Sequence, residues 1–152
     1  MSISLFLASV AASCIASDAN QPYEAMQRGF AGRDPAVVAS AYHDETAIGG
    51  VNPPRIRTAE ELPSLFAYVA PDDGSVLAID FKIIERHVGE RLGADIGLYR
   101  ITGDETPSYG GFTTVLSCGE DRVWRFTADL MHPADEEDWE TAICVDGGPC
   151  AE

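Results

Sequence analysis

The chain has 152 residues, of which 45% are apolar and 23% are charged, and this composition indicates one globular domain with a substantial core. Its 25 acidic residues outnumber 10 basic ones and give a net charge of -15, which repels phosphate backbones and anionic lipid. Nucleic acid is therefore not an expected partner, and the longest apolar run is too short to span a membrane.

The amino terminus has the pattern of an export signal. An apolar run covers residues 3–8, and small residues follow up to Ala16 and Ser17, before the polar Asp18. We therefore expect residues 1–17 to be a signal peptide cleaved near Ala16 or Ser17, and the protein to be periplasmic or secreted. Because no basic residue precedes the run, a buried N-terminal helix and a misassigned start codon are the alternatives.

We expect disulfide bonds at this location, because thiols pair in an oxidising compartment. Cys144 and Cys150 flank the tight loop 145–149, a spacing that a disulfide can close. Cys14 would leave with the signal peptide, or carry a lipid anchor in a less favoured alternative. Cys118 would then be an unpaired, small apolar residue, because no neighbouring position supplies a base that would make it a nucleophile.

The first half of the chain predicts three short amphipathic helices. The first covers about residues 22–31 and ends at Gly32, and the second follows the N-cap Asp34. The third begins at a capping box formed by Thr58 and Glu61. These helices present one apolar face each, so they need a sheet or another helix to cover that face.

The second half predicts four long strands whose side chains alternate between two faces. Alternation assigns an apolar set to the inner face: Leu77, Ile79, Phe81, Ile83, Leu92, Ala94, Ile96, Leu98, Phe112, Thr114, Leu116, Trp124, Phe126, Ala128 and Leu130. It assigns a polar set to the outer face: Asp80, Lys82, Arg86, Asp95, Tyr99, Thr113, Ser117, Arg125, Thr127 and Asp129. The expected interior therefore holds no ionisable group from the sheet.

The order of these elements resembles the nuclear transport factor 2-like superfamily. Short segments at residues 30–34, 42–47, 97–99, 111–115 and 121–125 resemble its exported, SnoaL-like bacterial members, which are related to polyketide cyclases and ketosteroid isomerases. No single segment is decisive, but their order along the chain is.

The resemblance implies an α+β fold of the cystatin or nuclear transport factor 2-like kind. In this fold a cone-shaped, curved and mostly antiparallel sheet packs against three N-terminal helices, here over residues 18–133. An acidic tail, residues 134–152, would follow with its disulfide loop, and we expect the acidic run 135–138 to be solvated. The family also implies an apolar cavity between the sheet and the helices, and commonly a homodimer through the outer sheet face.

The resemblance does not transfer a catalytic residue. The positions of the general base, the tyrosine and the protonated acid of ketosteroid isomerases fall near Gly50, near Met26, and near Phe112 or Thr113. We therefore expect noncatalytic binding of a small apolar ligand or of a protein partner, without a cofactor. The candidate cavity residues are Met26, Phe30, Tyr42, Phe66, Phe81, Phe112, Trp124 and Phe126.

Two alternatives stay open. A cofactor-free isomerase, cyclase or hydrolase would use polar groups from helices and loops, with Tyr42, His43, Tyr68 and His132 as candidates. An acidic chain of this size would also suit an inhibitor of a basic periplasmic toxin domain. The 3 histidines lack the short spacing typical of metal ligands, so no metal site is expected.

Overall fold

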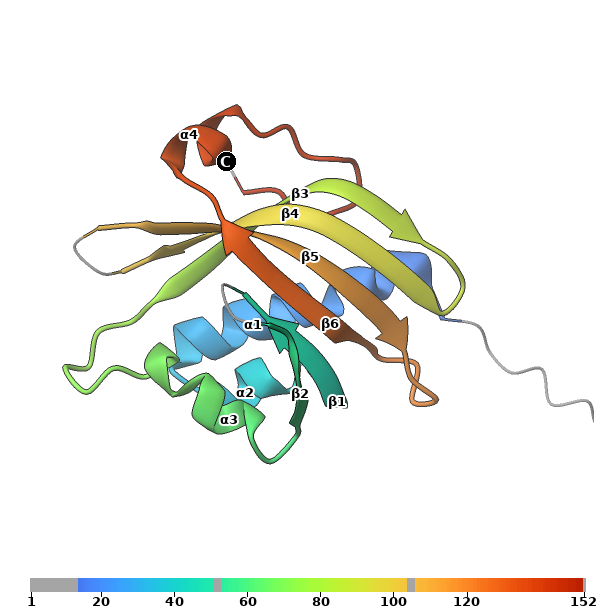
Figure 1. Cartoon of the computed structure of the whole chain (residues 1–152), viewed down its shortest axis with the longest axis horizontal. Helices are drawn as coiled ribbons and strands as arrows, with labels where there is room; N and C mark the ends of the chain where they lie inside the picture. Colours follow the sequence, from blue (N-terminus) through green and yellow to red (C-terminus); the bar gives the residue numbers. More distant parts are fainter. Residues whose placement is uncertain (1–13, 51–52, 104–105, 152) are drawn as a thin grey trace, which may run out of the picture.

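The computed structural model describes residues 14–50, 53–103 and 106–151, and its centre is a curved, six-stranded sheet (Figure 1). The strand order is β2-β1-β6-β5-β4-β3, and neighbouring strands are antiparallel except for the parallel pair β1 and β6. The strands are β1 (Tyr42–Gly49), β2 (Arg55–Thr58), β3 (Ala78–Val88), β4 (Leu92–Thr102), β5 (Ser108–Cys118) and β6 (Trp124–Pro133). The predicted fold class, a curved sheet packed against N-terminal helices, is confirmed.

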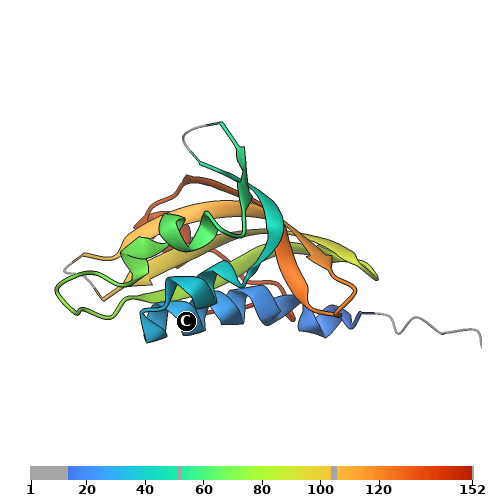
Figure 2. The ribbon, with the colours of Figure 1, turned by 90° about the horizontal axis from the view of Figure 1, so that it is seen from below.

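The helices from the first half of the chain lie on the concave side of the sheet, with α1 crossing beneath the arch (Figure 2). They are the 3-10 turn η1 (Ala16–Asn20), α1 (Gln21–Gly32), α2 (Pro35–Ala39), α3 (Leu62–Leu65) and the 3-10 turn η2 (Ala67–Val69). α1 buries the predicted face of Tyr23, Met26 and Phe30 against the sheet.

Two helix starts follow different rules. Asp34 caps α2 as predicted, because its carboxylate accepts hydrogen bonds from the N–H groups of Ala36 and Val37. The predicted capping box is only half formed, since Glu61 accepts from the N–H of Thr58 while Thr58 still lies in β2. The third helix therefore begins at Leu62, later than predicted.

The predicted inner and outer faces are wrong for much of β4 and β6. In β6, Thr127 is an extra residue, because Phe126 faces Leu116 while Ala128 faces Val115. Such a β-bulge reverses the alternation beyond it. Asp129 therefore turns inward and is 7% exposed, whereas Leu130, which was predicted inside, is 38% exposed on the outer face.

β3 also has a bulge, and β4 has the opposite phase to the predicted one along its length. A bulge between Ile83 and Glu85 brings Arg86 opposite Asp95, and both side chains lie on the inner side, not on the outer face as predicted. Along β4 the inner positions are occupied by Gly93, Asp95, Gly97, Tyr99 and Ile101, so the predicted inner residues Leu92, Ala94, Ile96 and Leu98 belong to the outer face.

A glycine on β4 explains why the inner face needs no large residue there. A Cβ at Gly97 would lie 2.6 Å from Cζ of Phe112, whose ring on β5 lies across this position. The aromatic rings of neighbouring strands thus fill the concave face. Alternation alone does not distinguish the two possible phases of such a strand.

The carboxyl-terminal segment is packed against the protein and is not a free tail. After α4 (Glu136–Thr141) the chain runs along β3, where Pro149 O accepts from the N–H of Ile83 at 3.1 Å. Trp139 is 1% exposed, with the ammonium of Lys82 and the guanidinium of Arg100 each 4.8 Å from its ring. The acidic residues 136–138 are exposed, but they form the first turn of α4.

One disulfide closes a loop within the carboxyl-terminal segment, and the other links the amino-terminal segment to the end of β5. Cys144 and Cys150 are paired, as their spacing predicted, and Lys82 of β3 bridges to Cys150. Cys14 is paired with Cys118, with Cα atoms 6.4 Å apart, so the prediction that Cys118 is unpaired is wrong. A mature chain that keeps this bond retains Cys14, and cleavage near Ala16 or Ser17 would break the link.

The rest of the predicted signal peptide, residues 1–13, lies outside the described residues. Two disulfides indicate an oxidising compartment. Across the described part of the chain, no helix has the length and apolar character needed to cross a membrane.

Candidate functional site

A cavity of about 210 Å³ lies between the concave sheet and the helices. Its lining is mostly aromatic and aliphatic: Tyr23, Met26, Tyr42, Ile48, Leu65, Phe66, Tyr68, Ile79, Phe81, Tyr99, Ile101, Phe112, Thr114, Phe126, Asp129 and Met131. Leu65, Tyr68 and Met131 are partly exposed, and we take them as the mouth through which the cavity meets solvent. An apolar cavity with few polar groups is the usual form of a small-molecule site.

The structure places most of the predicted cavity residues in this lining. Met26, Tyr42, Phe66, Phe81, Phe112 and Phe126 all contribute to it. Phe30 and Trp124 do not. Phe30 is fully buried one turn farther along α1, and the indole N–H of Trp124 donates to Ile15 O beneath the N-terminal segment.

Asp129 is the polar centre of the cavity, although the alternation of β6 predicts it on the outer face. Its Oδ2 accepts a hydrogen bond from the Tyr42 hydroxyl at 2.7 Å. Burial raises the pKa of Asp129 from 3.8 to about 6, although the Tyr42 hydrogen bond opposes part of that rise. The adjacent apolar residues Leu130 and Met131 break the alternation of β6, and they are the sequence signal that could have indicated the bulge.

The other hydroxyls around the cavity stay protonated at neutral pH. Burial, together with the nearby Asp129 charge, raises the pKa of Tyr42 well above its ordinary value. Burial likewise raises the pKa of Tyr99, and it raises that of Tyr68 to about 12. Asp129 is thus the group in the described lining that changes charge near neutral pH.

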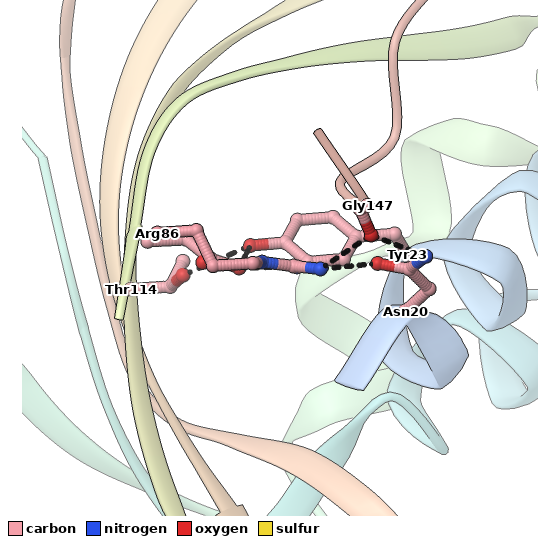
Figure 3. Close-up of polar contacts among 6 residues, drawn as sticks. Asn20, Tyr23, Arg86, Thr114 and Gly147 are labelled. Atoms are coloured by element: carbon pink, nitrogen blue, oxygen red, sulfur yellow. Dashed lines mark hydrogen bonds and ion pairs between the residues drawn. The ribbon is translucent and has the colours of Figure 1, made fainter. Parts of the chain in front are cut away.

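Tyr23 is held by a second buried carboxylate, Asp95, which is 0% exposed (Figure 3). The Tyr23 hydroxyl donates to Asp95 Oδ2 at 2.7 Å, and Arg86 binds both oxygens of Asp95, at 2.8 and 2.7 Å. Arg86 also donates to Asn20 Oδ1 at 2.6 Å and to Gly147 O at 3.1 Å. Asp95 is fully paired, and its network fixes the position of Tyr23 in the cavity lining. Asp129 is then the acid of the described lining, and its partner is the neutral Tyr42 hydroxyl.

The histidines predicted as catalytic candidates lie elsewhere. His43 Nε2 is 2.8 Å from Ser117 Oγ, on the outer side of the sheet, and His132 is exposed beside Gly111. His87 is exposed and pairs with Glu85. Among residues 14–50, 53–103 and 106–151, no group of three or more His, Cys, Asp and Glu side chains could hold a metal ion.

Other solved structures have a similar fold. No family model and no curated protein matches the chain. An NTF-2-like protein of unknown function from Shewanella oneidensis MR-1 aligns with a TM-score of 0.66 at 17% identity, over 76% of this chain and 97% of that one. A ketosteroid isomerase-like protein from Erwinia carotovora atroseptica aligns with a TM-score of 0.60 at 14% identity, over 79% and 96%.

A third similar structure is an LEH-like epoxide hydrolase from M. tuberculosis, with a TM-score of 0.53 and 16% identity, over 78% of this chain and 80% of that one. These structures show that the chain has the nuclear transport factor 2-like fold, as the resemblance in the sequence implied. Similarity at this level of identity concerns the fold and not the reaction.

The raised pKa of Asp129 predicts how stability depends on pH. Because the folded chain holds this proton more tightly than the unfolded chain, the stabilising contribution is complete below a pH of about 4 and is lost as pH rises through about 6. The difference between the ordinary pKa of 3.8 and the pKa of about 6 in the folded chain corresponds to about 3 kcal/mol of unfolding free energy. Asp129→Asn has no titrating group at this position, so it lacks this pH-dependent part of the unfolding free energy. In urea unfolding, the stability of the variant relative to wild type should therefore be higher at pH 7 than at pH 4.

The matched control is Asp44→Asn, which changes an exposed carboxyl on β1. It should follow the wild-type profile within about 0.5 kcal/mol. An Asp129→Asn profile parallel to that of wild type would contradict the raised pKa.

Proposed function

We propose that this protein binds a small, mostly apolar molecule in the cavity, and that one polar group of this molecule contacts Asp129. The observation that carries the proposal is a buried carboxyl with one hydrogen-bond partner inside an otherwise apolar cavity. Burying an acid in this way opposes folding at neutral pH, and proteins retain such groups chiefly at functional sites.

The geometry of the carboxyl supports the same proposal. Its Oδ2 is engaged by Tyr42, whereas its Oδ1 has no hydrogen-bond partner among the described residues. A ligand that enters past Leu65 and Met131 would supply a donor to that oxygen and bury its apolar part against the rings. This replaces the sequence-based expectation of a wholly apolar interior.

Proton transfer without a cofactor is a second candidate function. A carboxyl with a pKa of about 6 is matched to general acid–base catalysis near neutral pH, and the Tyr42 hydroxyl donates beside it. Relatives of this fold are described as ketosteroid isomerase-like and as an epoxide hydrolase, which makes an isomerase, cyclase or hydrolase the reaction class to test. Asp129 and Tyr42 would take the roles for which His43 and His132 were candidates.

The outer sheet face supports a proposal about assembly. Ile96 of β4 and Leu130 of β6 both face Thr113 of β5, and Val115 lies on the same side of the sheet. These partly exposed side chains form an apolar patch beside the region covered by Trp139. We propose that a second copy of the chain covers this patch in a homodimer.

Ligand binding can be tested with cyclohexanol as a neutral probe, observed by saturation-transfer NMR. Wild type should show transfer to the ring protons, and Ile101→Trp should abolish it, because the indole would fill the cavity that Ile101 lines. Ile143→Trp, on the exposed part of the C-terminal segment, should bind like wild type. No transfer in wild type, or equal transfer in Ile101→Trp, would contradict a ligand site here.

Proton transfer can be tested by deuterium exchange at the carbons beside the carbonyl of cyclohexanone in D₂O. The wild-type rate above buffer should rise as the pH passes about 6, because the ionised carboxyl is the base. Asp129→Asn should lower the catalysed rate at least about 100-fold. A wild-type rate equal to that of buffer, at a ketone concentration shown to be bound, would exclude this ketone-enolising activity.

The dimer can be tested by light scattering during size-exclusion chromatography. Wild type should elute with the mass of a dimer, and Val115→Lys should give a monomer, because it places a charge in the centre of the buried patch. Val76→Lys, exposed outside the sheet, should remain dimeric. A monomeric wild type at micromolar concentration would overturn the proposed assembly.

A further inference from the structure

The geometry points to an amine as the polar group of the ligand: a small apolar molecule with a positive charge that would sit between the aromatic rings and the free oxygen of Asp129. This inference rests on the proposed ligand-binding function and narrows it to one chemical class. It follows from the rings, from the charges around the cavity and from the free oxygen.

Aromatic rings line the same cavity as the carboxyl. Tyr42 stacks on Phe66 with ring centroids 5.2 Å apart, and Tyr42 also lies 5.2 Å from Phe126. Phe66 in turn lies 6.4 Å from Tyr68 at the mouth. The face of an aromatic ring attracts a cation, so a cavity lined by rings and one carboxylate suits an ammonium group.

The charges around the cavity have one sign. Asp129 is its acid, and the described lining contains no Lys, Arg or His. The guanidinium of Arg86, behind Tyr23, is neutralised by Asp95, and Arg57 on β2 pairs with Glu61 at 3.7 Å. With a net charge of -15 the whole chain also attracts cations, whereas an anionic ligand would bring a second negative charge beside Asp129.

The free oxygen of Asp129 completes the site. An ammonium N–H could donate to Oδ1 while Tyr42 continues to donate to Oδ2. An alcohol would donate one hydrogen bond to that oxygen but would carry no positive charge to compensate the buried carboxylate. The ion pair would therefore favour the amine over an alcohol of the same shape.

The test compares two probes of equal shape, cyclohexylmethylammonium and cyclohexylmethanol, by calorimetric titration at pH 7.5. Wild type should bind the amine at least about tenfold more tightly than the alcohol. Asp129→Asn should remove this preference by weakening amine binding far more than alcohol binding, because the amide has the shape of the carboxyl without its charge. Asp44→Asn lowers the overall negative charge equally outside the cavity and should retain the preference.

A second variant separates the rings from the carboxylate. Tyr68→Leu keeps Asp129 and removes one aromatic face at the mouth, so it should weaken amine binding severalfold more than alcohol binding. Equal affinity of wild type for both probes would overturn the amine inference and leave the ligand-binding function standing. Failure of both probes to bind would contradict the two proposals together.

Discussion

The buried pair between Arg86 and Asp95 is the interaction on which the arrangement of this protein depends. A carboxylate that is 0% exposed must be fully paired, because an isolated buried charge would cost several kcal/mol. Its partners come from β3, from α1 through Tyr23 and, by way of Arg86, from Asn20 and the carbonyl of Gly147 (Figure 3). One charge thus fixes a helix, two strands and the disulfide loop relative to one another.

Tyr23 connects the Arg86–Asp95 pair to the cavity, because it binds Asp95 and also lines the cavity. Its ring meets Phe81 and Phe126 edge-on, each at 5.0 Å, so α1 is held across the concave face at a fixed depth. Beside Tyr23, aromatic rings pack over glycine residues of the neighbouring strand, as Phe112 packs over Gly97. This close packing of the wall would lower the entropic cost of the proposed ligand binding.

The two buried acids of the sheet, Asp95 and Asp129, differ in the partners that compensate their charge. Asp95 receives a bidentate guanidinium and a phenol, and its contribution is structural. Asp129 receives one phenol, and burial raises its pKa to about 6 because its charge is removed from water. A β-bulge at Thr127 brings Asp129 inside, so a local irregularity of the backbone creates the chemical centre of the cavity.

The sequence by itself determined the features that depend on near neighbours: the buried face of α1, the cap at Asp34, the pairing of Cys144 with Cys150, the order of the elements and most of the aromatic lining. Only the tertiary structure decided which face Asp95 and Asp129 occupy, that Cys14 pairs with Cys118 across 104 residues, and that Trp139 packs on the sheet. The physical reason is that helix periodicity and caps are set within a few residues. A bulge, a strand phase or a long-range contact is set instead by packing against segments distant in the chain.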